Sequence, residues 1–179
     1  MIFDPHYWPG SWPGWATVIG SGLNWEQIDQ ALDYLLEKMQ SCYQERAQGK
    51  NEFPPIVIAV DEISALTDEL PDAGTHLIKI AQQGRKVGMF TILTSHSTEV
   101  AQMGFAGKGN ARENFIFIEL PFVPAEDLYK PRVATIYQGN PRRKGNEPMG
   151  RYIVPPLREY TGRPNLNLCW LRQGASHPG

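Results

Sequence analysis

Apolar and polar residues alternate along the first half of the chain in patterns that predict helices. Between residues 24 and 49, apolar side chains recur at three- and four-residue steps with acidic side chains between them. This spacing predicts an amphipathic helix, with Asn24 and Gln27 as a capping pair at its start and Gly49 as its stop. Residues 73–86 repeat the pattern and predict a second helix.

Three apolar runs, at residues 55–60, 88–93 and 114–119, predict buried strands. Runs without a polar alternation are typical of parallel strands whose two faces are both covered by helices. The succession of strands and helices therefore predicts an α/β fold with one parallel sheet flanked by helices. In such sheets the chemistry lies at the carboxyl ends of the strands.

A loop rich in proline and glycine follows the first predicted strand end, at residues 1–6. Residues 7–15 contain three of the five tryptophans of the chain. A loop of this kind packs its rings against the protein or uses them to bind a ligand.

The composition changes near residue 121, because nine of the fifteen prolines occur from that position onward. Residues 1–127 carry eight basic and seventeen acidic side chains, a balance of −9, and residues 128–179 carry nine basic and two acidic ones, a balance of +7. We therefore expect a core at 1–127 and a basic, proline-rich extension at 128–179. Within the extension, residues 133–137 and 151–154 predict a hairpin with Arg142, Arg143 and Lys144 at its turn.

The whole chain has 179 residues, 41% of them hydrophobic, and a formal charge of −2, which fits ordinary globular folding and excludes a disordered or fibrous polymer. Two distant cysteines, no signal peptide and no apolar run long enough for a bilayer predict a soluble, cytoplasmic protein without a membrane segment. The four histidines are scattered, which argues against a structural zinc site.

Polar side chains follow two of the predicted strands. Asp61 and Glu62 end the first apolar run, and two carboxylates in this position suit magnesium and phosphate chemistry. The simpler interpretation is that they cap the next helix. Ser95 and His96 follow the second run, where they can contact a phosphate or position water, or where His96 is a surface histidine beside a helix cap at residue 97. Arg85 lies at a helix end, where the dipole favours cations in any protein.

Residues 80–96, following the strand at 58–62, resemble the second half of the motor domain in the FtsK/HerA superfamily of hexameric P-loop ATPases. The helix at 31–39 looks like the one before that family's Walker B strand, and residues 4–6 look like the strand end after its Walker A helix. The resemblance covers residues 1–120, most specifically 56–96, with 150–154 in the place of a late strand. It implies a RecA-like P-loop NTPase sheet that is incomplete at its N-terminus.

Carried over by position, the resemblance implies that Asp61 is the Walker B magnesium residue and Glu62 the catalytic glutamate. His96 stands where the family has a sensor glutamine, and Ser95 occupies the preceding hydroxyl position, so that Asp61 and Ser95 would contact Mg-ATP. A histidine in the sensor position departs from the family pattern and makes the charge there depend on pH. Arg85 falls near an arginine that reaches the nucleotide of a neighbouring subunit in related motors.

The phosphate-binding half of such a site is absent from the sequence. A P-loop requires the pattern G-x-x-x-x-G-K-[ST], but the Gly-Lys pairs at 49–50 and 107–108 are followed by Asn51 and Gly109. Three explanations stay open: the chain is a fragment of a longer one, a second polypeptide supplies the P-loop, or catalysis has been lost. We expect the chain alone to bind ATP poorly.

Two main functions are consistent with these patterns. The first is part of an ATP-driven, FtsK/HerA-like DNA-translocating motor, active as an ATPase only with an added Walker A segment and Mg-ATP, in a self-associated ring or with a P-loop-bearing partner. The alternative is a non-catalytic interaction or regulatory subunit that keeps the fold and binds a motor partner or DNA. For DNA, the candidate contacts are Arg142, Arg143 and Lys144, which suit the phosphate backbone, and Lys108 in a glycine-rich loop that is a candidate pore loop. The cations at the turn are equally consistent with a solvated surface hairpin or with docking on an acidic neighbouring subunit.

Overall fold

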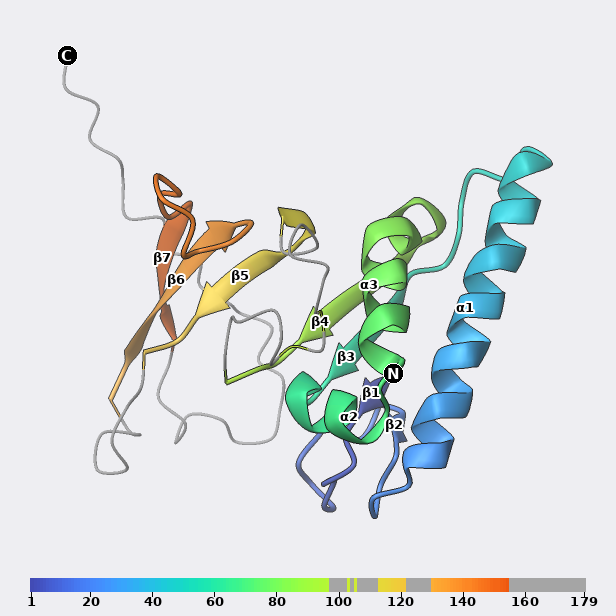
Figure 1. Cartoon of the computed structure of the whole chain (residues 1–179), viewed down its shortest axis with the longest axis horizontal. Helices are drawn as coiled ribbons and strands as arrows, with labels where there is room; N and C mark the ends of the chain where they lie inside the picture. Colours follow the sequence, from blue (N-terminus) through green and yellow to red (C-terminus); the bar gives the residue numbers. More distant parts are fainter. Residues whose placement is uncertain (97–102, 104, 106–112, 122–129, 155–179) are drawn as a thin grey trace. The chain divides into compact units, whose positions relative to one another are not determined.

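The computed structural model describes residues 1–96, 103, 105, 113–121 and 130–154, and the chain forms two compact units, Met1–Phe115 and Ile116–Gly179 (Figure 1). The first unit holds a parallel sheet with its helices, and the second holds a small antiparallel sheet. This arrangement confirms the predicted α/β class.

The parallel sheet of the first unit has four strands in the order β2-β1-β3-β4. Two of them are two-residue strands at the start of the chain, and the other two are five-residue strands that pair along their whole length. Their bounds are β1 Ile2–Phe3, β2 Val18–Ile19, β3 Ile56–Val60 and β4 Met89–Leu93.

The first predicted helix is confirmed as α1, Trp25–Ala47. The Asn24 side chain accepts a hydrogen bond from the Gln27 backbone N–H at 3.1 Å, as a cap should. The Gln27 side chain does not complete a reciprocal box; its Oε1 accepts the backbone N–H of Gly20 at 2.9 Å instead. This bond ties the start of α1 to the end of β2. Beyond the helix, Gly49 adopts a φ of 101°, which explains why the helix stops there.

Two helices connect β3 to β4. The first, α2 (Ile63–Glu69), was not predicted from the sequence, and the second, α3 (Ala73–Gln83), continues into a 3₁₀ turn, η1 (Gly84–Val87). The predicted helix at 73–86 therefore changes type at Gly84. A Cβ at that position would lie 2.8 Å from the Met89 Cβ, so only glycine lets the turn pack this closely on the start of β4.

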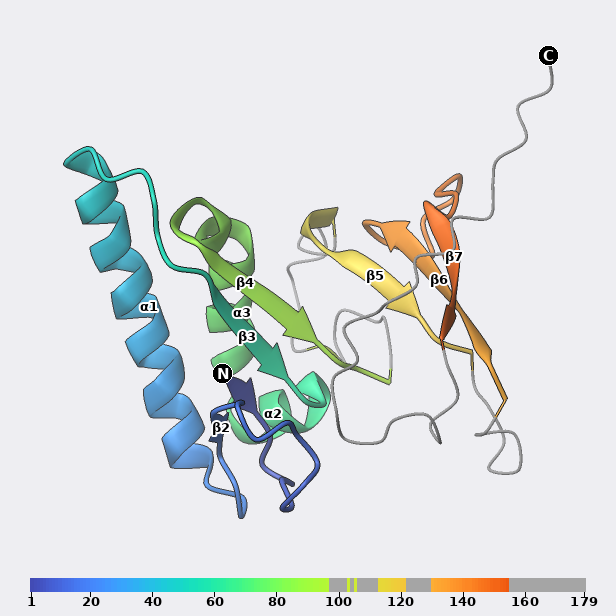
Figure 2. The same ribbon diagram turned by 180° about the vertical axis from the view of Figure 1, so that it is seen from behind.

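The described helices cover one face of the sheet, and the exposure of apolar side chains on the other face corrects the prediction that both faces are covered. Figure 1 shows α3 in front of β3 and β4, and Figure 2 shows it behind them, with α1 beside it in both views. On the covered face Ile58 and Met89 are buried. On the other face, Val57, Phe90 and Ile92 are 45%, 44% and 55% exposed. Because all these residues are apolar on both faces, the sequence pattern cannot show which face is covered.

The second unit is an antiparallel sheet in the order β5-β6-β7, formed by Ile116–Glu119, Arg132–Gln138 and Gly150–Val154. The predicted hairpin is confirmed as β6 and β7, in which Val133 pairs with Ile153. The assignment of residues 114–119 to the parallel sheet is wrong, because β5 pairs antiparallel with β6. Its apolar run does not indicate two covered faces, since Ile116 and Ile118 are 64% and 63% exposed.

Among the described residues, no helix has the length and apolar character needed to cross a membrane. The longest helix, α1, buries one stripe and exposes acidic side chains on its remaining surface. The stripe comprises Ile28, Leu32, Leu35, Met39 and Cys42.

The one-sided sheet predicts unequal costs for two isoleucine truncations on neighbouring strands. Ile58→Ala removes a fully buried side chain and should lower the free energy of unfolding by about 2–5 kcal/mol. Ile92→Ala, on the open face, should cost less than about 1 kcal/mol. Urea unfolding monitored by circular dichroism compares the two, and equal losses would mean that Ile92 is covered in solution.

Candidate functional site

The carboxyl ends of three neighbouring strands meet at one edge of the parallel sheet. Asp4 follows β1, Asp61 follows β3 and Thr94 follows β4. The Asp61 N–H donates to the Phe3 carbonyl at 2.9 Å, and the Thr94 N–H donates to the Val60 carbonyl at 3.0 Å. The predicted acidic pair therefore lies between a second aspartate and a threonine, at the edge where parallel α/β sheets bind ligands.

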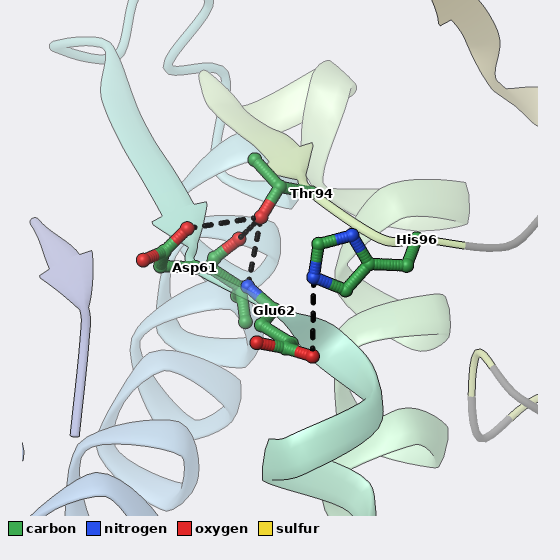
Figure 3. A network of polar contacts seen from close by, with 5 residues as sticks. Asp61, Glu62, Thr94 and His96 are labelled. Carbon is green, nitrogen blue, oxygen red and sulfur yellow. Dashed lines mark hydrogen bonds and ion pairs between the residues drawn. The ribbon is translucent and has the colours of Figure 1, made fainter. Parts of the chain in front are cut away.

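The Thr94 hydroxyl is the centre of the contacts at this edge (Figure 3). Its oxygen accepts the Glu62 backbone N–H at 2.7 Å and lies 3.1 Å from Asp61 Oδ1, to which it donates. From the sequence alone, Ser95 and His96 are the residues predicted for the site at this strand end, and Thr94 is missed. The signal that would have found it is register, since Val60 pairs with Leu93 and the two following residues must therefore be neighbours.

Glu62 has an unusual backbone conformation, with a φ of 57° in the left-handed region. It occupies the position before α2, yet its side chain makes no capping hydrogen bond. The interpretation of Glu62 as a helix-capping side chain is therefore wrong. Its Oε1 lies 3.5 Å from Nε2 of His96, whose side chain is 88% exposed, so the two predicted catalytic residues face each other at the surface (Figure 3).

Asp61 is suited to the water shell of a magnesium ion. Its Oδ1 accepts the Thr94 hydroxyl, while Oδ2 makes no hydrogen bond or ion pair within the described residues. Magnesium in nucleotide sites keeps several waters and takes only one or two carboxylates besides the phosphates. The described part of the chain contains no group of three or more acidic, histidine or cysteine side chains that could hold a metal without a nucleotide.

Asp4 is the buried charged residue of the core, at 4% exposure. Both of its oxygens are used: Oδ1 accepts the His6 N–H at 2.9 Å and Oδ2 accepts the Trp12 indole N–H at 2.6 Å. Trp12 thus anchors the predicted tryptophan loop on the site edge. Trp8 and Trp15 of the same loop remain 65% and 77% exposed. Asp4 is a structural anchor here and offers no unused oxygen to a ligand.

Of two further predicted site residues, Ser95 lies next to the site and Arg85 lies far from it. Ser95 directly follows Thr94 and is half-buried at the same edge. Arg85 is exposed in η1, before the amino end of β4, so about 20 Å of chain along the strand separates it from Thr94. Arg85 therefore lies at the opposite edge of the sheet from Asp61. A role of Arg85 toward the nucleotide of another subunit stays a prediction.

The candidate DNA contacts lie outside the first unit or outside the described residues. Arg142, Arg143 and Lys144 are exposed in the turn between β6 and β7. Asn140 shapes this turn, because its side chain accepts the Arg142 N–H at 3.0 Å and its carbonyl accepts the Arg143 N–H at 3.1 Å. Lys108 and most of its glycine-rich loop lie outside the described residues.

Comparison with known proteins gives one partial similarity. The chain is 31% identical over 71 residues to the ESX secretion system protein EccC of Geobacillus thermodenitrificans (strain NG80-2), an FtsK/SpoIIIE-family ATPase. The match covers 39% of this chain and 5% of that relative, so the chain spans only a small part of the relative's length. No family model matches the chain, and no solved structure matches it. The similarity supports a distant relation to an FtsK-like ATPase region.

The left-handed backbone of Glu62 predicts that the protein is more stable with glycine than with alanine at position 62. A side chain in this region costs about 1–2 kcal/mol, and part of this is offset by the greater freedom of glycine in the unfolded chain. Glu62→Gly should therefore unfold at a higher temperature than Glu62→Ala, by up to about 1 kcal/mol in free energy. Both variants lose the contact with His96, so calorimetry isolates the backbone effect. A less stable glycine variant would contradict the strain.

Proposed function

We propose that the chain is part of the ATPase domain of an FtsK/HerA-like motor, with Asp61 and Glu62 as its acidic pair. The observation that carries the proposal is the edge where Asp61, Glu62 and Thr94 meet at the ends of paired parallel strands. Mg-ATP, when bound, supplies the phosphoanhydride that is cleaved. Asp61 Oδ2 would hold a water of the magnesium shell, and Glu62 would accept a proton from the attacking water.

His96 has a positioning role in this proposal. Its Nε2 faces Glu62 Oε1 at 3.5 Å, so the imidazole either holds the carboxylate or turns toward the phosphate. Its high exposure leaves both orientations open to it.

The proposed site requires a P-loop that these 179 residues do not supply. The open face with Val57, Phe90 and Ile92 supports this requirement, since parallel sheets are normally covered on both sides. The outer side of β4 also pairs with no strand of the parallel sheet in the described chain. A strand bearing the P-loop would pair with the outer side of β4, and its helix would cover the open face of the sheet.

DNA is the proposed substrate of the motor, gripped through the turn at residues 142–144. Three consecutive cations on an exposed hairpin turn suit sequence-independent contact with phosphates. The first unit has a net negative charge and does not attract DNA by itself.

A second candidate function is a non-catalytic subunit that binds a motor partner. The same open apolar face favours it, because Phe90 and Ile92 form an exposed patch next to Val57 on the paired strand. The absence of a P-loop pattern in the sequence favours it as well. The two candidates differ in whether Glu62 takes part in hydrolysis.

The ATPase proposal predicts hydrolysis only when a P-loop is supplied. The chain alone should give no measurable ATP binding in calorimetry, whereas the chain co-expressed with a P-loop-bearing polypeptide that completes its site should hydrolyse ATP. Glu62→Gln should then lower kcat at least about 100-fold, because the amide cannot accept the proton. Glu69→Gln, at the end of α2, is the matched control and should leave the rate unchanged. Equal rates for Glu62→Gln and the unaltered chain would favour the non-catalytic subunit.

The DNA proposal predicts binding that weakens with salt. A variant with Arg142, Arg143 and Lys144 all replaced by Ser should bind duplex DNA more weakly, and its log–log salt slope should shrink by up to about 3. Fluorescence anisotropy at several salt concentrations measures both effects. A matched control replaces Arg85, Lys86 and Lys79 of the first unit by Ser. A salt-independent affinity, or an equal loss in the control, would contradict DNA binding through the turn.

A further inference from the structure

Thr94 contacts each of the four residues from the last one of β3, Val60, to the first one of α2, Ile63. Its backbone N–H donates to the Val60 carbonyl at 3.0 Å, and its carbonyl accepts the Ile63 N–H at 2.9 Å. Its hydroxyl accepts the Glu62 N–H at 2.7 Å and lies 3.1 Å from Asp61 Oδ1. The backbone contacts extend the pairing of β3 with β4 and are independent of the side chain at position 94. Only the hydroxyl contacts require threonine or serine.

The single proton of the hydroxyl determines the direction of these bonds. Because the Glu62 N–H is a donor, the oxygen of Thr94 must accept it, and the hydroxyl proton is left for one other acceptor. The Val60 carbonyl is 3.4 Å away and already accepts the Thr94 N–H, whereas Asp61 Oδ1 is nearer at 3.1 Å. The proton therefore goes to Asp61 Oδ1, and one hydroxyl joins the carboxylate of Asp61 to the backbone of Glu62.

These two bonds have different consequences for the acidic pair. The bond from Glu62 supplies a partner for an N–H that a left-handed turn takes out of the sheet, and so favours the strained φ of 57°. That φ sets the direction in which the Glu62 side chain leaves the strand end. The bond to Asp61 occupies Oδ1 and leaves Oδ2 for a ligand. The branched Cβ of threonine restricts the rotation of the hydroxyl and so fixes both bonds together.

We propose that Thr94 is a positioning residue for the Asp61–Glu62 pair, acting through its hydroxyl. The role in catalysis rests on the proposed function of these two carboxylates, whereas the positioning of Glu62 is a property of the chain alone. Thr94 itself need not touch nucleotide or metal. Figure 3 shows its hydroxyl between the Asp61 carboxylate and the Glu62 backbone.

The direct test is amide hydrogen exchange of the whole chain, measured by nuclear magnetic resonance. Thr94→Val keeps the size and branching of the side chain but removes the hydroxyl. The Glu62 amide should then exchange about tenfold faster, because its acceptor is lost. The Ile63 amide is the internal control, since it donates to the backbone carbonyl of Thr94 and should keep its rate. Thr94→Ser should restore slow exchange at Glu62.

Two outcomes would overturn the positioning role: an unchanged Glu62 amide in Thr94→Val, or a Thr94→Ser variant that exchanges as fast as Thr94→Val. If the valine variant does not fold, Thr94→Ala compared with Thr94→Ser gives the same test. A hydroxyl that only stabilises the sheet would speed exchange at Glu62 and Ile63 alike, which would also overturn it.

The catalytic part is tested in the complex with a P-loop polypeptide. Thr94→Val should lower kcat about tenfold with KM unchanged, and should have little further effect in a Glu62→Gln background, because both changes remove the same group from use. An unchanged kcat in Thr94→Val would overturn the catalytic role. If no complex hydrolyses ATP while the Glu62 amide responds as described, the proposed function fails and the positioning role stands.

Discussion

The in-register pairing of β3 with β4 is the constraint on which the candidate site depends. The two strands have equal length, run parallel and pair from Ile56 with Met89 to Val60 with Leu93. Because the two parallel strands end at the same level of the sheet, the residues that follow them lie side by side. Asp61 and Thr94 are therefore neighbours although 33 positions separate them in the sequence. A shift by one residue would turn Ile58 and Val60 from the covered face to the open one. The burial of these side chains therefore fixes the register, and the register assembles the polar edge.

Elements with a regular apolar pattern and local turn or cap residues could be predicted from the sequence. The exposure of apolar residues on the open face of the sheet could not. The helix at Trp25–Ala47 follows from its apolar stripe and the Asn24 cap, and the hairpin of β6 and β7 follows from turn-forming residues between two apolar runs. The acidic strand end at Asp61 was also visible as a break in an apolar run. In contrast, Val57, Phe90 and Ile92 are as apolar as buried residues, so composition could not reveal that they face outward. The apolar run at 114–119 was wrongly predicted to be a strand of the parallel sheet for the same reason.

Thr94 illustrates why the site was only half predictable. A threonine after an apolar strand is common, and its role here depends on the left-handed backbone of Glu62, which follows the neighbouring strand β3. No pattern at position 62 indicates that backbone, because glutamate rarely adopts it and glycine would be the residue expected there. A glutamate at a φ that favours glycine lowers the stability of the fold. Such strained residues are typical of functional positions, where the placement of a side chain offsets the loss of stability.

The uneven charge of the chain and the open face of the parallel sheet both favour contact with another polypeptide segment. An acidic unit with one uncovered apolar face has two means of contact with other polypeptide: apolar burial over Phe90 and Ile92, and attraction to basic surfaces. The acidic pair lies at the strand ends, where a segment covering the open face could bring phosphate-binding groups toward Asp61 Oδ2. Nucleotide binding would then depend on assembly, because the metal-binding carboxylate and the phosphate cradle would come from different segments. Under the proposed function, such a division would couple hydrolysis to assembly, since neither segment alone would hold both the magnesium ion and the phosphates.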